Sequence, residues 1–151
     1  MLLTFADGKP FATGVIPYAY TPAGDDRTPR ILLQVEFENI LSTAAIDTGA
    51  PYVICAPAVA QLIGLDPMAA LEQITIQIRG VRIRGNLHRL TLSFPASEGE
   101  PLSVDSTVFV PDEQSSVDWG NLPSFIGLTG CLERIRFAVD PSQDIFFFGS
   151  L

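Results

Sequence analysis

The segment around Asp47 combines residue types that can carry acid–base chemistry. Asp47 follows the apolar run Ala44–Ile46 and precedes Thr48 and Gly49. A carboxylate at the end of an apolar strand is partly buried, so it needs hydrogen-bond donors or a proton to be tolerated. Gly49 permits a tight loop whose backbone N–H groups turn toward that carboxylate, and the Thr48 hydroxyl can fix the loop against another segment. The tripeptide alone is a weak signal, because about one chain in thirty of this length would contain it by chance.

The chain has few other residues that could act in catalysis or bind a metal. The single histidine, His88, shares strand spacing with Leu90 and Leu92, which favours a structural position at the end of an inward-facing row. Without a second histidine or clustered cysteines, the ligand spacing of a zinc site is missing, and we expect no metal and no cofactor. Cys55 and Cys131 lie far apart in the chain. We expect reduced thiols in a cytoplasmic protein, with a single disulfide as the alternative.

Composition narrows the class of protein and its partners. The chain has 151 residues, of which 47% are apolar and 17% charged, so we expect a single folded domain. Its net charge of −8 argues against nucleic acid or an anionic membrane as the main partner. The longest apolar run, Val53–Ala60, contains Pro57 and is too short to span a bilayer. Residues 1–7 lack the pattern of a signal peptide, and we therefore expect a cytoplasmic location.

Periodicity indicates many short strands. Residues 1–30 are rich in proline and glycine, which favours an extended arm over a helix. Alternation over Ile31–Phe37 and the run Leu41–Ile46 predict a hairpin that leads into the Asp47 loop. Pro57–Ile63, closed by Gly64, predicts a short helix.

The rest of the chain continues the β pattern. We expect strands where apolar residues alternate, over 74–78, 81–83, 90–94, 102–110, 135–139 and 145–148, and a helical turn over 131–134. A parity shift at Gly80 predicts a turn or bulge. Residues 111–124 are polar and turn-rich and predict a surface loop. The pattern is typical of an all-β domain, a closed or nearly closed β-barrel or a sandwich.

Two motifs in this frame resemble those of the retropepsin-like aspartic proteases. The active-site loop of that family reads apolar-apolar-Asp-Thr-Gly-Ala/Ser, matched here by Ala45, Ile46, Asp47, Thr48, Gly49 and Ala50. A later apolar-apolar-Gly motif is matched by Phe125, Ile126 and Gly127. The resemblance covers residues 31–149. It implies a retropepsin-like closed β-barrel with one or two short helices, one lobe per chain, over residues 31–151.

The resemblance implies a mechanism and residue roles. Such proteases hydrolyse peptide bonds with two aspartates that share one proton, one acting as a base on water while the other donates to the scissile carbonyl. This chain holds a single Asp-Thr-Gly, so activity implies a homodimer in which Asp47 of each subunit meets on the two-fold axis. Thr48 would bond to the partner loop and Gly49 would let the substrate backbone approach, while Ile126 and Gly127 would pack beneath the loop.

The family also has a hairpin flap over its substrate. Here the resemblance implies the hairpin between Ile74 and Leu90, with Gly80 or Gly85 near its tip. Four arginines occur in it, namely Arg79, Arg82, Arg84 and Arg89. They could attract an acidic substrate or form the solvated face of the hairpin, and the solvated face is favoured.

Departures from the viral pattern leave a second function open. Pro51-Tyr52 and Leu128-Thr129 stand where retroviral members carry the acids and the arginine that brace their dimer, which indicates a bacterial or other cellular type. The leading hypothesis is an aspartic endopeptidase. The alternative is a protein of the same fold that binds or scaffolds peptides without cleaving them, with Asp47 as a structural hydrogen-bond acceptor. A β-barrel with an accidental Asp-Thr-Gly is the third interpretation.

Overall fold

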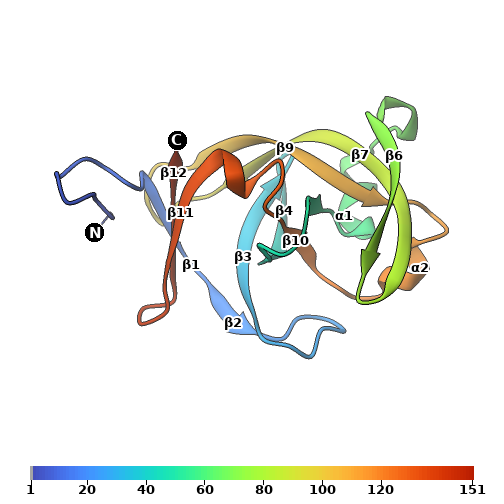
Figure 1. The fold of residues 1–151 in the computed structure, drawn as a ribbon, viewed down its shortest axis with the longest axis horizontal. Coiled ribbons are helices and arrows are strands. Elements are labelled where there is room, and N and C mark those ends of the chain that lie inside the picture. Colours follow the sequence, from blue (N-terminus) through green and yellow to red (C-terminus); the bar gives the residue numbers. More distant parts are fainter. Residues whose placement is uncertain (1) are drawn as a thin grey trace.

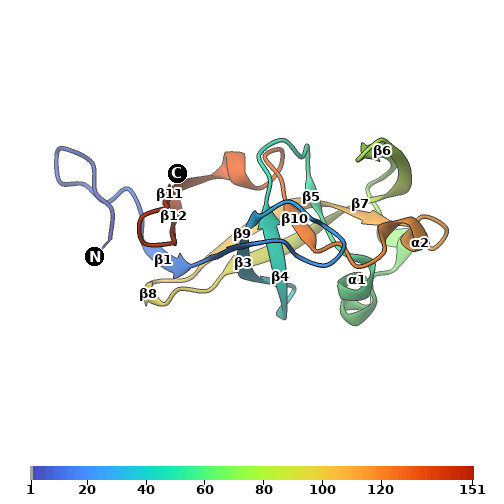
Figure 2. The same cartoon turned by 90° about the horizontal axis from the view of Figure 1, so that it is seen from below.

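The computed structural model describes residues 2–151, apart from the side chains of Ser116 and Val117. These residues form two β-sheets with short helices between strands, in an elongated molecule (Figures 1 and 2). The smaller sheet has the order β11–β12–β1–β8, formed by Ile135–Asp140, Ile145–Ser150, Gly14–Pro17 and Glu98–Gly99. It lies at the same end of the molecule as both termini (Figure 1).

The larger sheet carries the Asp47 loop. Its order is β2–β3–β4–β10–β5–β9–β7–β6. In chain order its strands are β2 Ala19–Thr21, β3 Arg30–Phe37, β4 Ile40–Ile46, β5 Val53–Ile54, β6 Glu72–Ile78, β7 Val81–Phe94, β9 Leu102–Pro111 and β10 Ser124–Ile126. An additional antiparallel contact, Phe37 opposite Leu92, joins β3 to β7 and brings the sheet back on itself.

The predicted hairpins form because apolar alternation places one face of each strand in the core. Leu33, Val35 and Phe37 of β3 are buried, and β3 turns into β4 through Glu38 and Asn39, both at positive φ. The separate strands expected over 81–83 and 90–94 form one continuous strand, β7, which pairs with β9 from Gly85 to Phe94. The fold is mostly β with short helices, which confirms the predicted all-β class.

Helices are short, and two of the four in the described part of the chain, α1 and η2, lie where the sequence predicts a helix or helical turn. Helix α1 spans Pro57–Ile63, with proline in its first turn and Gly64 in the left-handed conformation at φ 73°. The 3₁₀ turns η1 and η2 span Pro67–Ala69 and Leu132–Arg134. The expectation of a surface loop over 111–124 is wrong in part. Helix α2, Ser116–Trp119, lies there and buries the Trp119 ring, whose Nε1–H donates to the Leu122 carbonyl at 2.9 Å.

The first thirty residues contribute two strands. Strand β1 pairs with β12, and β2 pairs with β3. Val15 and Ile16 of β1 are buried, so this segment packs on the following chain. The division of the chain into an arm and a domain at residue 30 stays a prediction.

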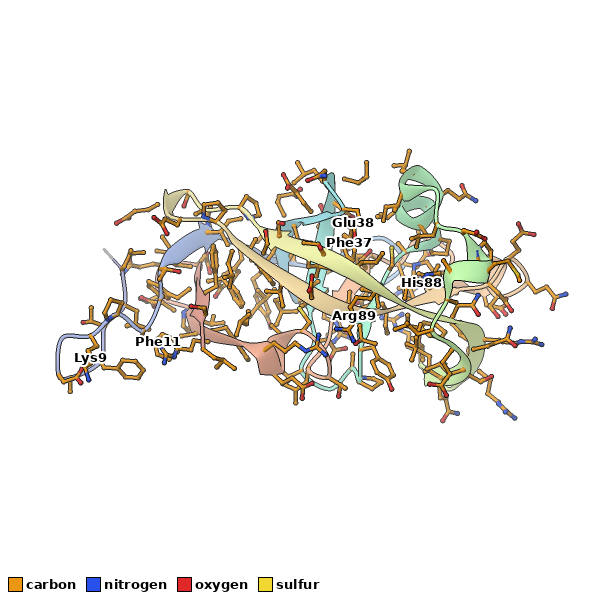
Figure 3. The ribbon with its side chains drawn as sticks, turned by 90° about the horizontal axis from the view of Figure 1, so that it is seen from above. Lys9, Phe11, Phe37, Glu38, His88 and Arg89 are labelled. Atoms are coloured by element: carbon orange, nitrogen blue, oxygen red, sulfur yellow. The ribbon has the colours of Figure 1, made fainter. Side chains whose placement is uncertain are left out.

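Two apolar clusters fill the interior. The larger joins both sheets, and in it the ring of Phe94 lies 5.6 Å from Phe148 and 6.2 Å from Phe146. Phe37 and His88 lie in the body of the molecule, whereas Lys9 and Phe11 belong to its N-terminal end (Figure 3). The smaller cluster lies beside the β6–β7 hairpin, where Trp119 meets Phe125 edge to face with centroids 5.9 Å apart.

Phe148→Ala should destabilise the fold by about 3–5 kcal/mol, because it removes a fully buried ring that joins the two sheets. Urea denaturation measures the change in the free energy of unfolding. Tyr20→Ala, at a side chain 66% exposed, is the control and should change it little. A loss below about 1 kcal/mol for Phe148→Ala would show that the sheets do not depend on this contact.

Candidate active site

Asp47 lies directly after β4, at the point where β4 runs parallel to β10. Ile46 is opposite Ile126 in this pairing, and the Asp47 N–H donates to the Ile126 carbonyl at 3.0 Å. The two motifs quoted from the sequence are therefore adjacent in space. Because the parallel ladder fixes the end of β4, the backbone of Asp47 is held while its side chain leaves the sheet.

Backbone N–H groups of the Asp47–Ala50 turn bind the Asp47 carboxylate and the Asp47 carbonyl. The Gly49 N–H donates to Asp47 Oδ1 at 3.0 Å, and the Ala50 N–H donates to the Asp47 carbonyl at 3.0 Å. The Asp47 side chain remains 30% exposed, and Thr48 is exposed. One carboxylate oxygen is thus fixed while the group stays open to solvent.

Gly127 lies against this turn at very short range. A Cβ at Gly127 would lie 2.0 Å from the Tyr52 carbonyl oxygen and 2.7 Å from that of Ala50. The Leu128 N–H donates to the same Ala50 carbonyl at 3.0 Å. Only glycine leaves room for this approach of backbone to backbone.

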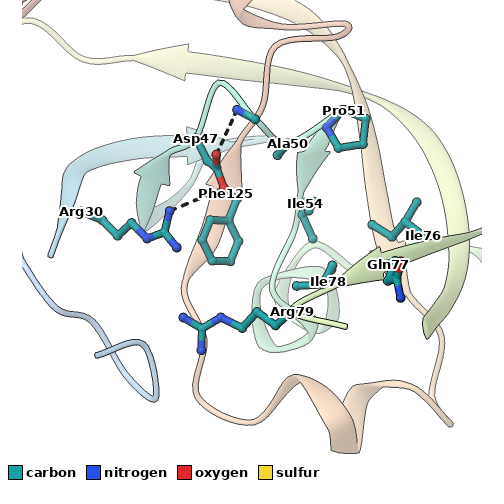
Figure 4. A pocket seen from close by; sticks show the side chains of 11 residues that line it. Arg30, Asp47, Ala50, Pro51, Ile54, Ile76, Gln77, Ile78, Arg79 and Phe125 are labelled. Carbon is teal, nitrogen blue, oxygen red and sulfur yellow. Dashed lines mark hydrogen bonds and ion pairs between the residues drawn. The ribbon is translucent and has the colours of Figure 1, made fainter. Parts of the chain in front are cut away.

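A pocket of about 170 Å³ opens beside the Asp47 carboxylate (Figure 4). Ala50, Pro51, Ile54 and Phe125 line it from the body of the protein, Arg30 from the start of β3, and Ile76, Gln77, Ile78 and Arg79 from the β6–β7 hairpin. Its volume suits one or two side chains, less than the ~300 Å³ of a typical small-ligand site.

The two glycines expected near the flap tip occupy different places. Gly80 lies in the turn of the hairpin, with Arg79, and has φ 77°. Gly85 lies inside β7 opposite Ile74, and a Cβ there would lie 2.2 Å from the Val110 carbonyl oxygen. The tip is therefore at Gly80, and Gly85 is where the hairpin meets β9.

A charged cluster that sequence analysis missed borders the pocket. Arg30 Nη1 lies 3.8 Å from Asp47 Oδ2, and Arg30 Nε donates to Asp26 Oδ2 at 2.9 Å. Arg79 Nη2 donates to the other Asp26 oxygen. Arg79 is thus ion-paired at the edge of the pocket while its side chain remains 43% exposed, so it lies on the solvated face of the hairpin and also contacts Asp26. The Gly24-Asp25-Asp26 turn was visible in the sequence, but nothing in it pairs Asp26 with Arg79.

Asp26 is buried as an anion. Its residue exposure is 1%. Burial by itself raises the pKa of this carboxyl, but the Thr28 N–H, Arg30 and Arg79 outweigh burial and lower the pKa below the ordinary 3.8.

His88 and both cysteines do not line the Asp47 pocket. His88 is buried, and burial lowers its pKa although Asp66 acts in the opposite direction. It lines a second pocket of about 420 Å³ against α1 and β9. Cys55 and Cys131 are free thiols, and burial raises the pKa of Cys55 to about 12 and that of Cys131 to about 11.

Within residues 2–151, no three His, Cys, Asp or Glu side chains are grouped to hold a metal ion. In the same part of the chain, no helix has the length and apolar character needed to cross a membrane.

Gly127→Ala should lower the free energy of unfolding by about 1–3 kcal/mol, because the added Cβ forces the Asp47 turn away from β10. Thermal and urea unfolding measure this. An unchanged unfolding free energy would contradict the close packing beneath the turn.

The ion-paired Asp26 should make stability depend on pH. Since its folded pKa is below 3.8, its contribution is fully present above that value and is lost as the pH falls toward the folded pKa. The stability difference between the parent and Asp26→Asn should therefore narrow from pH 5 to pH 3, as measured by urea denaturation. A constant difference would contradict the assignment of an ionised buried carboxylate.

Comparisons with known proteins bear on the fold. No family model matches the chain, and no curated protein matches it significantly. The crystal structure of a retropepsin-like aspartic protease from Rickettsia conorii is similar, with a TM-score of 0.56 and 19% identity over 91% of this chain and 94% of that one. The retroviral protease-like domain of Ddi1 from Leishmania major has a TM-score of 0.47 and 15% identity over 81% and 90%. The fold of this chain is thus that of the retropepsin-like aspartic proteases, as its two motifs predicted.

Proposed function

We propose that this protein is an aspartic endopeptidase that acts as a homodimer. The observation that carries the proposal is the Asp47 carboxylate. One of its oxygens accepts the Gly49 N–H, its side chain is 30% exposed, and it borders a pocket roofed by the β6–β7 hairpin. A carboxylate in this setting can exchange a proton with a substrate held beneath the hairpin.

The dimer supplies the second carboxylate. Two Asp47 side chains at a two-fold axis would share one proton, because two adjacent like charges do not both ionise. The exposed Thr48 lies beside Asp47 and the 42%-exposed Leu128 follows Gly127, so both suit an interface around that axis. Pro51 and Leu128 make no ion pair of the retroviral kind, so apolar contact would carry this part of the interface.

The chemistry proceeds in two steps. In the first, the ionised carboxylate takes a proton from a water molecule, whose oxygen attacks the scissile carbonyl carbon, while the protonated carboxylate donates its proton to the carbonyl oxygen. In the second, the carboxyl that took the water proton gives it to the amine nitrogen while the other carboxylate takes a proton from one hydroxyl of the tetrahedral intermediate, so the C–N bond breaks, the amine and the carboxylic acid leave, and the pair again holds one proton. Gly49 lets the peptide backbone approach the carboxylates, and the pocket walls Ile54, Ile76 and Phe125 receive an apolar side chain of the peptide.

A second candidate function is peptide binding without cleavage. Arg30 favours it, because its guanidinium lies 3.8 Å from Asp47 and compensates that charge within one protomer. In such a protein Asp47 is a structural acceptor for the Gly49 N–H. In either case the partner is a protein or peptide, and the free, buried Cys55 and Cys131 support a reducing, cytoplasmic setting.

Asp47→Asn separates the two functions. Asn keeps an oxygen for the Gly49 N–H, so the fold should persist, while kcat/KM should fall by at least about 10³ because the proton carrier is lost. Cleavage of a diverse peptide library is followed by mass spectrometry from about pH 4 to pH 7, with the highest rate expected in mild acid.

A result in which no peptide is cleaved can be interpreted only when the protein is known to be folded and dimeric. Sedimentation equilibrium and circular dichroism show whether each variant is folded and dimeric. Undiminished cleavage by Asp47→Asn would contradict the mechanism, and silence from a folded dimer of the parent would favour the binding function.

A further inference from the structure

We propose that Asp26 is a positioning residue that holds the β6–β7 hairpin over the Asp47 pocket. This inference rests on the function proposed for that pocket. The Asp26 carboxylate joins Arg79 in the turn of the hairpin to Arg30 at the start of β3, with one oxygen for each guanidinium. These three residues are called the Asp26 cluster below. The cluster connects the roof of the pocket to its side wall.

One end of the cluster is firmly anchored. The Asp26 N–H donates to the Ala23 carbonyl at 3.0 Å, and Asp26 Oδ1 accepts the Thr28 N–H at 3.1 Å. The neighbouring Asp25 carboxylate accepts the Asn121 N–H at 2.8 Å. The loop that carries Asp26 is thereby fixed both to itself and to the segment before β10, and it reaches toward the end of the hairpin (Figure 1).

The other end of the cluster is a projecting ribbon. Strand β6 is the last strand of the larger sheet and pairs with β7. Toward the tip, β7 is joined to the rest of the described chain at Arg84, whose carbonyl accepts the Asp112 N–H at 3.0 Å and whose N–H donates to Ser115 Oγ at 3.1 Å. Beyond that point Ile83 belongs to the smaller apolar cluster, Ile76 and Ile78 pack against it, and the Arg79–Asp26 contact adds a polar connection at the turn.

The residue type at position 79 supports a role for its side chain. Arg79 and Gly80 have φ angles of 52° and 77°, the left-handed pair of a two-residue hairpin turn. The first position of such a turn favours Asn, Asp or Gly, and a longer side chain is strained there. The ion pair with Asp26 offsets that strain.

The geometry of the Arg79 ion pair allows it to open. The Arg79 side chain is 43% exposed, so its ion pair with Asp26 is weaker than a fully buried one and can break and re-form. A peptide several residues long needs more space than the pocket of about 170 Å³. The Arg79–Asp26 contact therefore opens for entry and favours the closed hairpin once the peptide is bound, while Arg30 stays beside Asp47.

Hydrogen exchange followed by mass spectrometry tests the tether. In the full-length protein, Arg79→Gln and Asp26→Asn should each speed amide exchange over residues 72–84 about tenfold, and the double variant should exchange no faster than either single one. Arg82→Gln is the matched control. It removes an exposed arginine of the same hairpin for which the described chain shows no side-chain partner, and it should leave exchange unchanged.

Exchange in Arg79→Gln that is as slow as in the parent would overturn the proposal. This variant lies at an exposed tip, so it remains decisive if Asp26→Asn fails to fold. Exchange that rises equally in Arg82→Gln would also overturn it, because any loss of charge would then suffice.

Cleavage kinetics separate positioning from a purely structural role. Arg79→Gln should lower kcat/KM about tenfold, mainly through KM, because the hairpin holds substrate and transition state alike. Arg79→Lys, which keeps the charge, should restore part of the loss. If the folded, dimeric parent cleaves no peptide, the proposed protease function fails while the exchange result still decides the role of Asp26. Unchanged kcat/KM in an Arg79→Gln variant of an active parent would overturn the positioning role.

Discussion

The parallel pairing of β4 with β10 is the constraint on which the site depends. It places Ile46 opposite Ile126 and commits the Asp47 N–H to the Ile126 carbonyl. Since successive side chains of a strand alternate between faces, a slip of one residue would turn the carboxylate to the other face. Gly127 then allows the carbonyls of Ala50 and Tyr52 to approach its backbone closely. The register of β4 against β10 and the absence of a side chain at Gly127 together hold the Asp47 carboxylate at the surface.

Two carboxylates of the same residue type serve different ends because their donors differ. Asp26 is buried and takes hydrogen bonds from Thr28, Arg30 and Arg79. Its negative charge joins the loop before β3 to the turn of the β6–β7 hairpin. Asp47 accepts the Gly49 N–H, has Arg30 at 3.8 Å and stays partly exposed, so its carboxylate remains accessible from the pocket. The two carboxylates therefore differ in their exposure to solvent and in the number of hydrogen-bond donors around them.

Local patterns in the sequence predicted most of the frame. Apolar alternation located β3, β9 and the two ends of β7, and the Pro57–Gly64 pattern located α1. The short helix α2 was missed because polar turn residues surround it, and its burial depends on Trp119 meeting Phe125 from β10. Gly85 was indistinguishable from a tip residue, since only the approach of the Val110 carbonyl shows why glycine is needed there.

The sequence by itself determined the class of the fold and the identity of the central acid, because both are written in neighbouring residues: strand periodicity, turn residues and Asp-Thr-Gly followed later by Phe-Ile-Gly. Tertiary structure alone decided which charges meet. Arg79 and Asp26 are 53 positions apart, and Arg30 reaches Asp47 across the β3–β4 hairpin. Ion pairs over such separations depend on how loops close around the core, which no local pattern encodes.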